Sequence, residues 1–257
     1  VEVVDAIQAS EVSVIAVDIP SGVHADSGAV MGCAVMADVT ITFAAKKIGH
    51  MLLPGLAHVG RLIVADIGMR SADFGVMPFD VWENGTPELP TPSAEDHKYS
   101  RGQVLGFGGP EMTGASRLAC LAAARAGAGM VRLGVPDAAH DIYAQSLMSV
   151  IAERAESAED WALLLSKHTP NACVIGPGAG VSKRTNMALA ALLATDIPAV
   201  LDADSIALLA QDARLREAVA KRTAPTCITP HDGEYVRLAR AMDLDVAADK
   251  LSRGRTL

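Results

Sequence analysis

The stretch QVLGFGGPEMTGASRLACLAAARA, residues 103–126, decides the fold. Its first five residues, 103–107, form an apolar run that predicts a buried strand, and two glycines then turn the chain. The alanine-rich segment 114–126 predicts a helix whose small side chains let it lie close to a sheet. A strand followed at once by a helix is the repeating unit of a parallel α/β sheet.

The same alternation extends on both sides of this stretch. After it, strands are predicted at 130–135, 172–176, 199–201 and 226–229, and helices at 183–195 and 212–221. Before it, strands are predicted at 12–18, 39–43 and 61–66. A polar, proline-containing stretch at 71–97 separates the two blocks and predicts a linker. The fold class is therefore α/β, with parallel sheets that carry helices on both faces.

The composition argues against a nucleic-acid-binding protein and against a membrane-spanning one. The 257 residues carry 22 Lys and Arg against 30 Asp and Glu, a net charge of −8, and half of them are hydrophobic. This acidic balance argues against a nucleic-acid binder, and no apolar run approaches the ~18–20 residues that a membrane span needs. We expect the four scattered cysteines to be buried, reduced thiols of a cytoplasmic protein: Cys33, Cys120, Cys173 and Cys227.

The turns that follow the strands are the candidate binding sites, because ligands of parallel α/β sheets collect at the carboxyl ends of strands. Polar or glycine-rich turns occur at 18–22, 106–116, 176–180, 201–204 and 229–234. The second is spaced like a phosphate-binding P-loop, but Ala115 stands where that motif needs a lysine. The turn at 106–116 is compatible with two interpretations. It forms either a glycine-lined pocket for an anion or a nucleotide, or a plain tight turn between a strand and a helix.

The other turns also have structural interpretations. Asp18 could cap its strand in an Asx-type turn, and Asp202 or Asp204 could cap a helix rather than bind magnesium or a substrate hydroxyl. His231 could donate to a ligand, and Glu234, in the first turn of the next helix, could reach a metal or a phosphate. The remaining histidines and one lysine pair are interpreted as surface residues: His24, His50, His58, His97, His140, His168, Lys46 and Lys47.

Taken in order, these motifs resemble two known domains. AVDIPSG (16–22), ADVTITF (37–43) and ADIG (65–68) are similar to the second half of YjeF-type NAD(P)HX epimerases. Six later segments are similar to motifs of the dehydratase domain of the same repair pathway. They are HKYSRG (97–102), the glycine turn at 106–116, RAGAG (125–129), GPGAG (176–180), LDAD (201–204) and TPHDGE (229–234). The chain therefore resembles the bifunctional NAD(P)H-hydrate repair enzymes.

The resemblance implies two three-layer α/β/α domains. A partial Rossmann-like epimerase domain would occupy 1–75, a linker 76–96, and a partial ribokinase-like dehydratase domain 97–257. The epimerase half would interconvert the R and S forms of hydrated NADH and NADPH, with Asp18 as the catalytic residue at the substrate and Ser21 helping to hold a potassium ion.

The dehydratase half would use ADP or ATP, with Mg²⁺, to phosphorylate the S hydrate, and phosphate would then leave to restore NAD(P)H. Ala115, Gly178 and His231 match family positions that line the hydrate site, and Glu234 matches a position near the nucleotide, metal and phosphate. The implied partners are NADHX or NADPHX and further copies of the chain in a homo-oligomer, without nucleic acid or membrane.

Two family motifs are not found in these 257 residues: the Asn-Asn-Gly-Gly-Asp-Gly loop of the epimerase, and the Gly-Thr-Gly-Asp anion hole whose Asp is the dehydratase base. Ala179 also stands where the family usually has Leu. The resemblance thus implies a fragment cut at both ends, and we expect little dehydratase activity from it alone, because phosphoryl transfer depends on positioning and charge stabilisation. Two alternatives remain open: a ribokinase-like kinase of a vitamin precursor, and a non-catalytic binding module of the epimerase fold.

Overall fold

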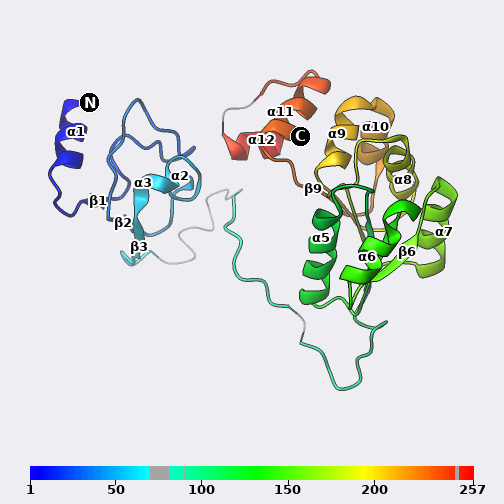
Figure 1. The fold of residues 1–257 in the computed structure, drawn as a ribbon. Coiled ribbons are helices and arrows are strands. Elements are labelled where there is room, and N and C mark those ends of the chain that lie inside the picture. Colours follow the sequence, from blue (N-terminus) through cyan, green and yellow to red (C-terminus); the bar gives the residue numbers. More distant parts are fainter. Residues whose placement is uncertain (70–80, 90, 247–248) are drawn as a thin grey trace. The chain divides into compact units, whose positions relative to one another are not determined.

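The structure is a computed structural model that describes residues 1–69, 81–89, 91–246 and 249–257 (Figure 1). The chain forms two compact units, which we call unit 1 (Val1–Gly85 with Ala247–Leu257) and unit 2 (Thr86–Val246). Each unit contains one parallel sheet with helices, so the mixed α/β fold is confirmed. Within the described residues, no helix has both the length and the apolar character needed to cross a bilayer.

Unit 1 is built on a three-stranded parallel sheet with the strand order β1 (Ile15–Val17), β2 (Val39–Phe43) and β3 (Arg61–Ala65). All three strands were predicted, but β1 is shorter than 12–18. It begins late because the Val14 amide donates to the Asp38 carboxylate instead of to a neighbouring strand. The described residues of this unit form the helices α1 (Glu2–Ala9), α2 (Ile48–Met51), α3 (Leu56–Val59) and α12 (Lys250–Thr256).

Unit 2 contains a six-stranded sheet in the order β6-β5-β4-β7-β8-β9, and every neighbouring pair is parallel. The chain starts at β4, proceeds outward through β5 and β6, and then returns to the other side of β4 for β7, β8 and β9. The strand order therefore reverses between β4 and β7, the position at which open α/β sheets usually bind ligands. The strands are β4 (Gln103–Phe107), β5 (Met130–Val135), β6 (Ile151–Arg154), β7 (Ala172–Ile175), β8 (Ala199–Leu201) and β9 (Thr226–Ile228).

Helices cover both faces of this sheet, which gives unit 2 three layers (Figure 1). On one face, Phe107 packs edge-to-face on Trp161 at 5.0 Å between ring centroids, within the larger core. On the other face, Cys120 and Tyr143 belong to the smaller core. The helices of the first face are α7 (Ala158–His168), α8 (Lys183–Leu193), α9 (Asp204–Gln211), α10 (Ala213–Lys221) and α11 (Asp232–Ala241); those of the second are α5 (Thr113–Arg125) and α6 (His140–Ser146).

The cysteine expectation is correct for two residues and wrong for the other two. Cys120 and Cys173 are buried, and burial raises the pKa of each thiol to about 12. Cys227 is exposed and Cys33 only half-buried, although all four are free thiols. Cys227 is exposed because it pairs in register with the exposed Val200, on a part of the sheet face that neither α5 nor α6 covers.

The interdomain linker was predicted at 76–96. Residues 76–80 and 90 of that range lie outside the described residues. The described parts, 81–89 and 91–96, form neither helix nor strand. The domain boundaries themselves stay a prediction.

Candidate functional site

The glycine turns after β4 and β7 meet at the point where the strand order reverses. Gly109 and Gly178 approach so closely that a Cβ atom on Gly109 would overlap the Gly178 carbonyl oxygen. Gly178 in turn lies against the Met112 carbonyl and has a φ of +63°, a conformation that favours glycine. The glycines predicted to form a tight turn or a ligand pocket are therefore required here by backbone-to-backbone packing.

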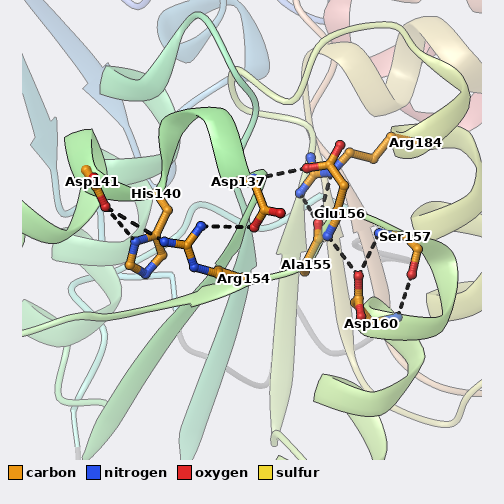
Figure 2. Close-up of polar contacts among 9 residues, drawn as sticks. All are labelled: Asp137, His140, Asp141, Arg154, Ala155, Glu156, Ser157, Asp160 and Arg184. Carbon is orange, nitrogen blue, oxygen red and sulfur yellow. Dashed lines mark hydrogen bonds and ion pairs between the residues drawn. The ribbon is translucent and has the colours of Figure 1, made fainter.

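Two side chains, one fully buried and one half-buried, hold the first glycine turn from opposite sides of the sheet. The Tyr143 hydroxyl, fully buried in the smaller core, donates to the Gly109 carbonyl over 2.9 Å. From the other side, Arg184 donates to the Gly108 carbonyl over 2.9 Å and stacks on the Phe107 ring, 4.1 Å from its centroid. Figure 2 shows the same guanidinium reaching the Ala155 carbonyl, so it also ties this turn to the one after β6.

A surface hollow of about 340 Å³ lies beside the two glycine turns. Gly178 lines it, as does Asp204, the first residue of α9. Neither Ala115 nor His231 is among its lining residues. Ala115 lies in the first turn of α5, where its amide bonds back to the Met112 carbonyl, and the helix begins at Thr113. The structure thus places the three predicted hydrate contacts along one edge of the sheet, but only Gly178 in the hollow.

The two carboxylates after β8 point in different directions. Asp202 accepts a hydrogen bond of 2.8 Å from the Thr229 hydroxyl, in the turn after β9. Asp204 accepts one of 2.8 Å from the Gly180 amide, in the turn after β7. Each aspartate therefore ties a neighbouring turn to β8, and neither caps α9, whose N-cap is Ala203. The extended spacing that favoured a shared magnesium site does not bring the two carboxylates together.

His231 and Glu234 form a reciprocal cap at the start of α11. The His231 Nδ1 atom accepts from the amides of Gly233 and Glu234, and the Glu234 carboxylate accepts from the His231 amide over 3.0 Å. His231 is exposed, whereas Glu234 is buried. The His231 ring is exposed but already engaged, because its Nε2 atom also lies 3.3 Å from Glu234 Oε1. His231 and Glu234 are therefore local structural partners of each other. Among the described residues, no group of three or more acidic, histidine or cysteine side chains could hold a metal ion.

In unit 1, Asp18 does not form the Asx-type turn that its sequence allowed. Its carboxylate reaches across to the end of β2, where Oδ1 accepts from the Thr42 hydroxyl over 2.8 Å and from the Lys47 ammonium. The hydrogen bond from Lys47 is the main cause that lowers the pKa of Asp18 below its ordinary value. Asp18 is thus held ionised at the carboxyl end of β1.

The interpretation of Lys47 and His50 as plain surface residues is wrong. Lys47 forms the ion pair with Asp18, and His50 is fully buried in α2 with its Nε2 atom 2.8 Å from the Asp18 carbonyl oxygen. Burial lowers the pKa of His50 below its ordinary value. Sequence reasoning missed both because neither follows a strand directly. The available signal was their position just after β2, at the sheet edge that Asp18 occupies.

The predicted potassium ligand Ser21 lies exposed in the turn after β1. Its carbonyl oxygen already accepts a hydrogen bond of 2.9 Å from the Val35 amide. A potassium ion needs several oxygen ligands, and Ser21 supplies only its hydroxyl and its carbonyl oxygen. The donor set around Ser21 therefore does not fit a potassium ion by itself, and the same holds for Mg²⁺ at the diverging Asp202 and Asp204.

Two family models match the chain. The model described as NAD(P)H-hydrate dehydratase matches residues 104–257, and the model described as YjeF-related protein N-terminus matches residues 1–49. The bifunctional NAD(P)H-hydrate repair enzymes Nnr of Coxiella burnetii and Mycobacterium tuberculosis are each 37% identical to this chain, over 94% and 93% of it. The matched regions are 48% and 47% of those proteins, so the chain spans about half the length of these relatives.

The fold of the chain also has a counterpart among solved structures. A ribokinase-like superfamily protein from Enterococcus faecalis superposes with a TM-score of 0.52 at 20% identity, covering 65% of this chain and 59% of that one. At this level of identity the likeness concerns the fold alone. Since the dehydratase family model covers residues 104–257, more than half of the sequence, the chain belongs to the NAD(P)H-hydrate dehydratase family.

Proposed function

We propose that this chain takes part in the repair of hydrated NADH and NADPH. Unit 2 would bind the S hydrate and a nucleotide, ADP or ATP, and support the dehydration that restores NAD(P)H. Unit 1 would contribute to the interconversion of the R and S hydrates. The family membership and the two relatives named as bifunctional repair enzymes support this proposal.

The observation that carries the proposal is the meeting of the Gly109 and Gly178 turns at the reversal of strand order, beside a hollow of about 340 Å³. Such positions bind nucleotides and related ligands in open α/β sheets. Glycine backbone without side chains allows a ligand to approach the amide groups closely. We assign Gly178, Ala115 and His231 to the hydrate and Glu234 to the nucleotide side, with Asp18 as the reactive carboxylate of unit 1.

Potassium and Mg²⁺ remain part of the proposal only as additions to the assay, because the described donors do not complete either site. When bound, Mg²⁺ would neutralise nucleotide phosphate charge, and potassium would supply a fixed positive charge near unit 1. We also expect a homo-oligomer, which the mass from light scattering tests directly.

The test uses the protein expressed as the complete reading frame that contains this sequence. Separated R and S hydrates of NADH and NADPH are supplied with ADP or ATP and Mg²⁺, and regeneration is followed by the absorbance of the reduced nicotinamide. We expect nucleotide-dependent regeneration from the S hydrate, and use of the R hydrate only through prior epimerisation. No conversion of either hydrate contradicts the proposal.

The same assay separates the alternatives. A kinase of a vitamin precursor would phosphorylate thiazole or pyrimidine alcohols and leave the hydrates unchanged. A binding module without catalysis would bind a hydrate and leave the ratio of R to S at its uncatalysed value, with or without potassium.

A further inference from the structure

Four residues from different parts of unit 1 form one hydrogen-bonded group, which we call the Asp18 clamp: Asp18, Thr42, Lys47 and His50. Asp18 follows β1, Thr42 lies in β2, and the other two lie at and within the start of α2. Thr42 and His50 are fully buried, while the Asp18 and Lys47 side chains keep partial access to solvent. Two side chains of the clamp are therefore buried in the protein, while the Asp18 carboxylate is accessible to a ligand.

The Lys47 ammonium has no hydrogen left for a ligand. Its acceptors are Asp18 Oδ1, the Thr42 hydroxyl at 2.7 Å and the Phe43 carbonyl at 3.3 Å. An ammonium group has three donors and no acceptor, so these bonds use its whole capacity. Lys47 thus acts on the Asp18 carboxylate rather than on a bound molecule.

His50 fixes the main chain of Asp18. Its Nδ1 atom accepts from the Lys47 amide over 3.0 Å, so Nε2 must carry the ring proton and donate to the Asp18 carbonyl over 2.8 Å. Asp18 has a φ of +68°, a conformation that a residue with a side chain adopts at a cost. The buried imidazole stabilises that conformation and ties the Lys47 backbone to it.

The result is a carboxylate with one occupied and one available oxygen. Oδ1 accepts from both Thr42 and Lys47, and a hydrogen bond from the Phe43 backbone also lowers the pKa of the carboxyl. None of the clamp side chains donates to Oδ2, so that oxygen is the one left for a ligand. We propose that Lys47 and His50 are positioning residues that present Asp18 Oδ2 to a hydroxyl group of the hydrate. This inference rests on the proposed epimerase role of unit 1 and names the residues that prepare its reactive group.

The first test measures the clamp without any reaction. The Asp18 carboxyl is titrated by carbon NMR in the purified chain and in three variants: Lys47→Met, Lys47→Arg and Lys46→Met. Lys47 and His50 are the titratable groups that face Asp18, whereas Lys46 pairs with Glu83 at 2.8 Å and serves as the matched control. We expect the Asp18 pKa to rise by about one unit or more in Lys47→Met and to stay low in the other two. An unchanged pKa in Lys47→Met overturns the proposal.

The second test measures epimerisation in the complete reading frame. In Lys47→Met we expect kcat to fall about 10- to 100-fold, because the carboxylate is misplaced, and the acid limb of the pH profile to move up with the Asp18 pKa. A wild-type rate with an unmoved limb in this variant overturns the positioning role. If the wild-type protein epimerises neither hydrate, the proposed function fails, while the NMR titration still decides whether the clamp exists.

His50 is tested by a conservative pair of variants. Glutamine can both accept from the Lys47 amide and donate to the Asp18 carbonyl, whereas leucine can do neither. We expect His50→Gln to keep most of the rate and the low Asp18 pKa, and His50→Leu to lose both. Equal rates and equal Asp18 pKa values in the two variants contradict the role given to His50. If His50→Leu fails to fold, the Lys47→Met variant still tests whether the clamp positions Asp18.

Discussion

The contact between the two glycine turns predicts that Gly178→Ala is far more damaging than Gly180→Ala. Both residues have positive φ, +63° and +79°, so each alanine variant costs about 1–2 kcal/mol in backbone conformation. At Gly180 nothing lies within 4 Å of an added Cβ. At Gly178 the added atom would overlap the Met112 carbonyl oxygen and lie 3.2 Å from Met112 Cβ.

Because Met112 contributes backbone atoms, the overlap cannot be relieved by a side-chain rotation, and the two turns must separate. Overpacking of this kind costs about 1–3 kcal/mol, so we expect Gly178→Ala to lose about 2–5 kcal/mol in all. Urea unfolding followed by the fluorescence of the buried Trp161, in a Trp82→Phe background, measures both variants. Equal losses of stability in the two variants would refute the reasoning, as would unchanged hydrate binding in Gly178→Ala.

Three further predictions concern stability. Arg184→Met should lower the free energy of unfolding by about 2–4 kcal/mol, because it leaves the Gly108 and Ala155 carbonyls without their charged donor. A loss no larger than that caused by replacing an exposed arginine would contradict this. Arg222→Met should lower the free energy of unfolding by a similar amount, about 2–4 kcal/mol. The reason is that its guanidinium donates to the carbonyls of residues 192, 193, 195 and 197, at and just after the end of α8. The midpoint of urea unfolding tests this prediction. For His50 the pKa is lowered from 6.5, so the unfolded state binds the proton first and unit 1 should lose stability as the pH falls below that value. His50→Gln should flatten this loss between pH 6.5 and the lowered pKa, and an identical pH dependence in both proteins would contradict it.

Much of the fold could be predicted because apolar periodicity and turn chemistry act locally. β2, β4, β5 and β8 lie where their β-branched and apolar runs placed them. β6 was not predicted, since Ile151-Ala152-Glu153-Arg154 has no apolar alternation; Glu153 there is held by Arg132 of the neighbouring strand over 2.6 Å. The helix α7 was also missed, although its Ser157–Asp160 capping box was a usable signal.

The candidate site was predictable only as a set of turns on one edge. Which turns touch depends on the strand order, and that order is a property of the folded sheet. The Asp202 and Asp204 carboxylates illustrate this: they look like a pair in the sequence, but β7 and β9 on either side draw them apart. Likewise, Lys47 became part of the Asp18 environment only through the parallel pairing of β1 with β2.

The most direct test of the whole account is binding of the S hydrate of NADPH to the purified chain, mapped by backbone amide chemical shifts. The account predicts shifts in the turns 109–115, 176–180 and 229–234 at the carboxyl edge of the unit 2 sheet. It predicts none around Arg222 at the opposite edge, and weaker shifts with NADPH itself. Shifts confined to the opposite edge, or a stronger response to a thiazole alcohol than to the hydrate, would contradict it.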